Sequence, residues 1–149
     1  MDHSVEGSTA GNSKVETSEI LLVKPQSFMN TSGGPVKQLC QKYDIAPGEL
    51  IIIHDDMDIE CGKIRVKIGG GSAGHNGLKS LDAKLGTPKY ARVRVGVGHP
   101  PERMPVFDYV LREPRGDDAE NWAEGIISAA DAAEFLLTHT LADTQQEFN

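Results

Sequence analysis

The chain has 149 residues, 38% of them hydrophobic, so it can bury one sizeable core and we expect a single domain. Its formal net charge of −7, taken as an average, argues against a nucleic-acid-binding protein. No apolar run approaches the ~18 residues that a membrane-spanning helix needs, so we expect no membrane association.

The two cysteines, Cys40 and Cys61, form no Cys-x-x-Cys pair, and no secretory leader pattern is recognisable. We therefore expect a reduced protein of the cytoplasm, or of an organelle if the source is eukaryotic. Neither cysteine is expected to be a nucleophile, because no adjacent cation or base would activate its thiol.

The first half of the chain predicts a polar start followed by strands and a helix. Residues 1–17 are rich in Ser, Gly, Asn and Glu and predict a polar tail or a weak edge strand, and one domain then extends over 18–149. Short apolar runs predict buried strands over 18–24 and 50–54. Between them a helix is predicted from Pro35, with an apolar face made of Val36, Leu39, Cys40 and Tyr43.

The second half alternates strands with helices. Strict alternation of apolar and basic residues predicts strands over 62–68 and 91–98, each with a basic side, and 77–85 reads as a helix. A long amphipathic helix is predicted over 117–140, with Asp117 or Asp118 as its N-cap. We expect its buried face to comprise Ile126, Ile127, Ala130, Ala133, Leu136 and Leu137. The whole pattern predicts an α/β fold, a single three-layer domain in which helices flank a mixed, twisted sheet.

Charge is segregated along the chain. Between Lys63 and Arg94 lie eight basic residues and one acid, which gives this segment a charge of +7 and leaves −14 for the remainder. Such asymmetry allows a basic patch on an acidic protein. The alternative is a solvated basic face balanced by acids that fold nearby.

A glycine-rich loop, Gly69-Gly70-Gly71-Ser72-Ala73-Gly74-His75-Asn76-Gly77, connects a predicted strand to a predicted helix. It fits the Gly-x-Gly-x-x-Gly dinucleotide fingerprint, but the acid expected ~20 residues later is absent, and no Gly-Lys-Ser/Thr marks a P-loop. The loop could present amides to an anion or a developing oxyanion. The alternative is a structural turn whose polar side chains cap the helix.

A second polar cluster, His54-Asp55-Asp56-Met57-Asp58, follows a buried strand. Carboxylates at the carboxyl end of a strand could hold Mg²⁺ or Mn²⁺ together with a histidine. One of them could instead orient a base from elsewhere in the fold, as an aspartate orients histidine in a catalytic triad. The third alternative is that these acids simply face solvent and have no role in a site.

Four motifs together resemble the bacterial-type peptidyl-tRNA hydrolase family: the segment Phe28-Met29-Asn30-x-Ser32-Gly33, the cluster His54-Asp55-x-x-Asp58, the glycine loop through Lys79, and Arg92-x-Arg94-x-Gly96-x-Gly98. The resemblance extends from about Leu21 to the C-terminus. It implies a metal-free, cofactor-free monomeric enzyme that hydrolyses the ester between a peptide and the 3′ ribose of tRNA, which recycles tRNA in translation.

The resemblance also implies roles for individual residues. Asn30 and Asn76 would hold the substrate and its activated water, and Asp55 would orient the catalytic base. Phe28 and Met29 would line the peptide cleft. The segment from Gly74 through His75 to Lys79 would form a mobile rim. Lys67 and Arg94 would contact tRNA phosphates.

Two motifs of the family, Gly-x-x-Asn-Pro-Gly and Thr-Arg-His-Asn, do not occur in the sequence. The resemblance therefore implies that the chain enters the family's pattern late and lacks the general-base histidine, for which His3 in the polar tail is no substitute. Three readings follow: an impaired hydrolase, a non-catalytic RNA-binding relative, or a truncated gene product.

Overall fold

The structure is a computed structural model that describes residues 2–8, 18–25, 31–100, 104–105, 108–109 and 112–149. It divides into two compact units interleaved in sequence, one of residues 1–45 and 72–86 and the other of residues 46–71 and 87–149. We describe each unit separately.

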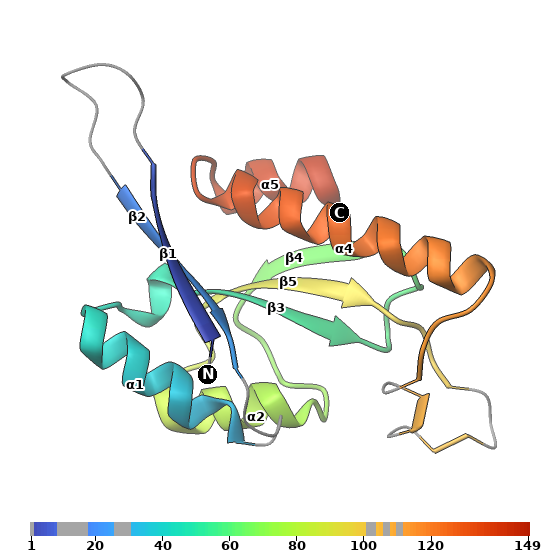
Figure 1. Ribbon diagram of the computed structural model, residues 1–149, viewed down its shortest axis with the longest axis horizontal. Helices are drawn as coiled ribbons and strands as arrows, with labels where there is room; N and C mark the ends of the chain where they lie inside the picture. Colours follow the sequence, from blue (N-terminus) through green and yellow to red (C-terminus); the bar gives the residue numbers. More distant parts are fainter. Residues whose placement is uncertain (1, 9–17, 26–30, 101–103, 106–107, 110–111) are drawn as a thin grey trace. The chain divides into compact units, whose positions relative to one another are not determined.

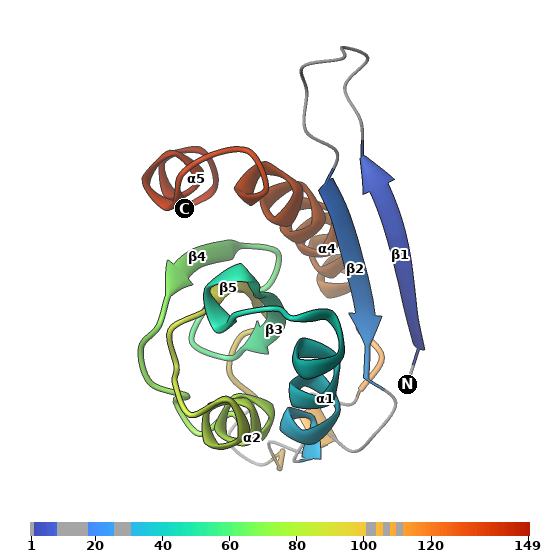
Figure 2. The same ribbon diagram turned by 90° about the vertical axis from the view of Figure 1, so that its left-hand side faces the viewer.

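The first unit holds a strand pair and a helix pair. Strand β1 (Asp2–Ser8) runs antiparallel to β2 (Ser18–Lys24), so a strand over 18–24 is confirmed, and the start of the chain is a strand. The predicted burial of β2 was wrong, because Leu22 and Val23 are 49% and 36% exposed. The predicted boundary between residues 17 and 18 stays a prediction. Helices α1 (Gly33–Tyr43) and α2 (Asn76–Leu85) lie side by side (Figure 2).

Helices α1 and α2 come close because a glycine stands at their contact. A Cβ atom added to Gly33 would collide with the carbonyl oxygen of Ser80, and the Gly33 N–H donates to Ser80 Oγ over 2.9 Å. Cys40 is buried on α1, as are Leu78 and Leu81 on α2. Cys40 belongs to the apolar face predicted for the first of these helices, but Tyr43, predicted on the same face, is 40% exposed.

The second unit is a mixed sheet covered on one face by helices (Figure 1). After a 3₁₀ turn, η2 (Pro47–Glu49), come β3 (Ile51–Asp56), β4 (Ile64–Ile68) and β5 (Ala91–Gly96). Their order is β3-β5-β4, with β3 parallel and β4 antiparallel to the central β5. The predicted mixed sheet and the alternating strands are confirmed, within one or two residues of the predicted bounds. The strand predicted as buried over 50–54 is only partly buried, since Ile53 in β3 is 52% exposed. The third layer of the predicted architecture stays a prediction.

Two helices cover the apolar face of this sheet, where sequence had predicted one. Helix α4 (Asp117–Leu136) ends before the predicted boundary, and α5 (Leu141–Phe148) begins anew after Thr140, whose Oγ1 accepts the N–H of Asp143 over 3.1 Å. The core consists of buried residues from the sheet and from α4: Ile64, Val66, Val93, Val95, Ala129 and Ala132.

The buried face of α4 was predicted only in part. Ala133 and Leu136 pack against the core, but Ile126, Ile127, Ala130 and Leu137 are exposed, Ile127 by 63%. Gly125, Ala129 and Ala132 are buried instead, and a Cβ on Gly125 would lie 3.3 Å from the Cα of Gly62. Small residues let the helix axis approach the sheet closely, and that close approach decides which stripe of the helix is buried.

The predicted N-cap of α4 was also wrong. Gly116 is the N-cap, with φ 60°, while Asp117 and Asp118 are the first helical residues. Only glycine adopts this backbone conformation readily, so it takes the cap position. The acids in the first turn still interact favourably with the helix dipole.

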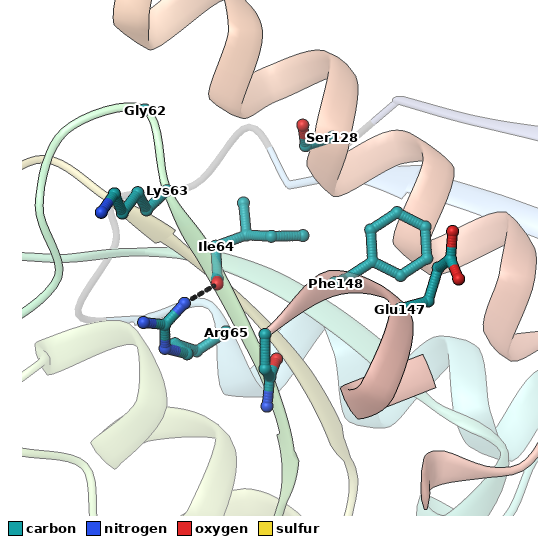
Figure 3. Close-up of a pocket in the computed structure, with 8 residues that line it drawn as sticks. Gly62, Lys63, Ile64, Arg65, Ser128, Glu147 and Phe148 are labelled. Carbon is teal, nitrogen blue, oxygen red and sulfur yellow. Dashed lines mark hydrogen bonds between the residues drawn. The ribbon is translucent and has the colours of Figure 1, made fainter. Parts of the chain in front are cut away.

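The free edge of β4 is closed by side chains of α5. The Val66 N–H donates to Asn149 Oδ1 over 2.7 Å, and the Val66 carbonyl accepts from Gln145 Nε2 over 3.0 Å. Further along this edge the Ile64 carbonyl accepts from Arg65 Nη1 over 3.0 Å, beside a polar groove to which α5 contributes Glu147 and Phe148 (Figure 3). Unpaired strand edges invite association, so these contacts protect the sheet.

Candidate nucleic-acid interface

Four cationic residues share the face of the sheet opposite the apolar core. Arg65 stands opposite Arg94 across the antiparallel ladder, and Lys67 stands opposite Arg92. Side chains alternate along a strand, so all four belong to one face while Val66, Val93 and Val95 point to the other. Like charges directly opposite one another repel, so each of these cations needs a separate means of support.

Arg94 is supported by Asp56. Its Nε donates to Asp56 Oδ2 over 2.9 Å, with the two side chains 23% and 10% exposed. The other carboxylate oxygen of Asp56 accepts the N–H of Asp58 over 2.8 Å. A charged hydrogen bond of this length fixes the guanidinium on the sheet.

Lys67 lies against the glycine loop. A Cβ atom on Gly70 would be only 2.9 Å from Lys67 Nζ, and Gly70 has φ +95°. Burial lowers the pKa of Lys67, the charges of Arg94 and Arg92 lower it further, and Asp56 opposes the shift. The Lys67 ammonium therefore stands in a surplus of positive charge, which a bound anion would relieve.

Arg92 fits neither an accessible basic patch nor a solvated basic face. It is fully buried, and its guanidinium donates to backbone carbonyls of the glycine loop. The strand alternation was read correctly, but the loop folds over this side chain. Lys63, before β4, is 60% exposed and pairs with Glu60 over 3.2 Å.

Asp55 belongs to the opposite face of the sheet from Arg94. It stands in register with Val95 on β5 and is half-buried, and its carbonyl is 2.8 Å from His54 Nδ1. Asp58, also in this cluster, lies 2.8 Å from His99 Nε2, with both side chains largely exposed. The described residues contain no group of three or more His, Cys, Asp or Glu side chains that could hold a metal ion.

The end of the glycine loop belongs to the first unit. His75 is the N-cap of α2, and its Nδ1 accepts the N–H of Leu78 over 3.2 Å. The capping alternative is thus confirmed for this histidine. In the neutral ring an acceptor Nδ1 puts the proton on Nε2. Asn76, the first helical residue, is exposed, and Gly74 has φ +81°.

The structure brings together only some of the predicted site residues. Lys67 and Arg94 share one face of the sheet, and Asp55 is on the other face of the same sheet. Gly74, His75 and Asn76 lie in the other unit, and Phe28, Met29 and Asn30 lie outside the described residues. Sequence reasoning missed Asp56 as the partner of Arg94. Alternation could have found it, because a residue next to Asp55 on a strand faces the other side.

Comparison with known proteins gives the same family as the motifs. The family model described as peptidyl-tRNA hydrolase matches residues 2–149. This chain belongs to the peptidyl-tRNA hydrolase family. A relative from Bifidobacterium longum is 44% identical over 147 residues, which are 96% of this chain and 74% of the relative. One from Paenarthrobacter aurescens is 45% identical over 128 residues, or 86% of this chain and 66% of the relative.

Solved structures of peptidyl-tRNA hydrolases share the fold. The crystal structure of the enzyme from Acinetobacter baumannii matches with a TM-score of 0.78 at 30% identity, covering 95% of this chain and 69% of the other. The expected family and the mixed α/β fold are therefore confirmed. Among the described residues, no helix of this family member is both long and apolar enough to cross a membrane.

Proposed function

We propose that this chain binds peptidyl-tRNA and acts in hydrolysis of the ester between the peptide and the 3′ ribose of tRNA. The observation that carries the proposal is the placement of Lys67 and Arg94 on one sheet face of a peptidyl-tRNA hydrolase family member, with Arg94 fixed by Asp56. Phosphate groups would take up the excess positive charge around Lys67. The acidic remainder of the chain would limit non-specific contacts.

The reaction needs a water molecule activated at the ester carbonyl. Water adds to that carbon, the acyl–oxygen bond breaks, and the 3′ oxygen of the ribose receives a proton. In the proposed assignment Asn30 and Asn76 hold the substrate and the water, and Asp55 orients the base. The exposure of Asn76 at the first position of α2 supports this role, since its amide and the helix N-terminus both offer donors.

Other parts of the proposal concern the peptide and the cell. Phe28 and Met29 would line the peptide cleft, with the segment from Gly74 to Lys79 as a rim. We propose a monomer that works where translation takes place, in the cytoplasm or, if the source is eukaryotic, in an organelle. None of these roles calls for a cofactor or metal ion.

A non-catalytic RNA-binding relative is the second candidate. One observation favours it: His75, the histidine of the glycine loop, uses Nδ1 to cap α2, which occupies that nitrogen as an acceptor. The basic face would bind tRNA in either case. The two candidates differ only in whether bond cleavage follows binding.

The test measures binding and cleavage on the same protein. Labelled tRNA is titrated at several salt concentrations, and release of the blocked amino acid from N-blocked aminoacyl-tRNA is followed in parallel. Salt-dependent binding with release above the rate without protein supports the hydrolase. Binding without release supports the RNA-binding relative, and absence of both overturns the proposal.

A further inference from the structure

Arg92 donates hydrogen bonds to the beginning of the glycine loop. Its Nη1 donates to the Gly71 carbonyl over 2.9 Å, and its Nη2 donates to the carbonyls of Gly70 and Pro88 over 3.2 and 3.3 Å. The guanidinium carbon also lies 4.8 Å from the centre of the Tyr90 ring. One side chain thus ties the loop to the segment that precedes β5.

This contact matters because the backbone that it holds is made of consecutive glycines. Gly69 and Gly70 have φ +68° and +95°, a region that side-chain-bearing residues rarely adopt, and glycine backbones lose much entropy when ordered. The Gly69 N–H donates to the Tyr90 carbonyl over 3.2 Å. The next two residues, Gly70 and Gly71, present their carbonyls to Arg92.

Arg92 also lies on the strand face that carries the basic residues, yet it is fully buried, so solvent and polyanions do not reach it. Gly70, which it holds, stands beside Lys67 Nζ. Displacement of Gly70 would therefore change the surroundings of the Lys67 ammonium. It would also change the backbone that leads to His75 and Asn76.

We propose that Arg92 is a positioning residue: it fixes the Gly69–Gly71 backbone beside Lys67 and makes no contact with tRNA phosphate itself. The meaning of this position for catalysis rests on the proposed function. The clamp, by which we mean the hydrogen bonds from Arg92 to the carbonyls of Gly70, Gly71 and Pro88, does not rest on that function. Lysine cannot replace it, because a single ammonium lacks the planar fork that reaches carbonyls on two segments.

The test compares Arg92→Lys with Arg65→Lys, a matched control on the same face whose arginine is exposed and bonded to the Ile64 carbonyl. Backbone ¹⁵N order parameters are measured for Gly69, Gly70 and Gly71, with residues 51–56 of β3 as the internal check on folding. In Arg92→Lys we expect the glycine values to fall from about 0.85 to below about 0.6, while β3 stays rigid. Arg65→Lys should retain rigid values throughout. Rigid glycines in a folded Arg92→Lys protein would overturn the clamp.

A second measurement uses the wild-type chain and needs no variant to fold. Inorganic phosphate is titrated while the side-chain NMR signals of Lys67, Arg92 and Arg94 are followed. We expect saturable shifts for Lys67 and Arg94, and none of comparable size for Arg92. A saturable Arg92 shift as large as that of Arg94 would make it an anion contact and overturn the proposal.

Kinetics separate positioning from a merely structural role. With N-blocked aminoacyl-tRNA, Arg92→Lys should raise KM by about threefold to tenfold and leave kcat within about twofold, because the loop backbone that it fixes stands beside Lys67, a proposed phosphate contact. A lowered kcat at wild-type KM would instead contradict positioning. If the wild-type chain neither binds nor cleaves tRNA, the proposed function fails, and the two NMR measurements still decide the clamp.

Discussion

Arg94 donates from Nε to Asp56 Oδ2 across 2.9 Å, which links β5 to β3 on the polar face of the sheet. The bond uses one of the five N–H donors of the guanidinium. An arginine fixed in this way has lost part of its conformational freedom before any ligand arrives, which lowers the cost of binding. The pair therefore orients Arg94 for a phosphate contact and uses only one of its N–H donors.

Salt dependence of tRNA binding tests this contact. Each neutralised phosphate contributes about −0.7 to −0.9 to the log–log slope of affinity against salt. Lys67→Ala and Arg94→Ala should each flatten the slope by up to about one unit and weaken different tRNAs similarly, since phosphates carry little sequence information. Lys63→Ala is the control, because Lys63 is 60% exposed and pairs with Glu60. An unchanged slope in the Lys67/Arg94 double variant would show that these side chains form a solvated face and do not contact tRNA phosphates.

Hydrolysis by this chain alone should be slow. We expect release of the blocked amino acid to be roughly 10²–10⁴-fold below that of the full-length Bifidobacterium longum relative at equal concentration, which is the usual contribution of general acid–base catalysis. The reason is that the Thr-Arg-His-Asn motif does not occur in the sequence. A rate within about threefold of the relative would show that another residue supplies the base, despite the capping bond of His75.

Asp55→Asn should impair catalysis and spare stability. We expect this in a fusion that adds a relative's Gly-x-x-Asn-Pro-Gly and Thr-Arg-His-Asn segment. A carboxylate that orients a histidine acts on its tautomer and on the imidazolium, so the rate should fall by roughly 10²–10⁴-fold while the melting temperature changes little. Asp58→Asn is the control, because that exposed carboxylate pairs with His99. Chelator should leave the rate unchanged; loss of activity restored by Mg²⁺ or Mn²⁺ would favour the metal reading.

The bond between Asn149 and Val66 should contribute measurably to stability. Asn149→Ala leaves the Val66 N–H without its 2.7 Å acceptor, so we expect a loss of about 1–2 kcal/mol in the free energy of unfolding. Urea denaturation provides the measurement. Gln146→Ala on the exposed side of α5 serves as the control and should change stability far less. Equal effects of the two substitutions would show that loss of the edge contact is not responsible.

Cys61 should react slowly with alkylating reagents near neutral pH. Burial raises the pKa of its thiol, Asp118 raises it further, and Arg112 opposes the shift. Since the thiolate is the reactive form, the alkylation rate should rise with pH over a range above that of the same cysteine in urea. Asp118→Asn should lower the pKa and accelerate the reaction, whereas Arg112→Gln should do the reverse. Identical pH profiles in native and unfolded protein would contradict this.

The sequence by itself determined the family and most of the strands and helices, although it joined α4 and α5 into one helix. Period-two alternation placed the apolar residues Val66, Val93 and Val95 on one side of two strands and the basic residues on the other, because a strand can bury only one side of such a pattern. The glycine loop and its neighbouring motifs identified the family, since these residues are spaced closely along the chain.

Only the tertiary structure decided how deep each side chain lies and what it contacts. Alternation gave Arg92 the same face as Lys67, but Arg92 is fully buried and donates hydrogen bonds to the glycine loop. On α4 the sequence favoured the bulky Ile126 and Ile127, whereas close approach to the sheet selected Gly125, Ala129 and Ala132. Asp56 and Arg94 are 38 positions apart, and Val66 and Asn149 are 83 apart. Local periodicity carries no information about such contacts, because they depend on how separate segments pack.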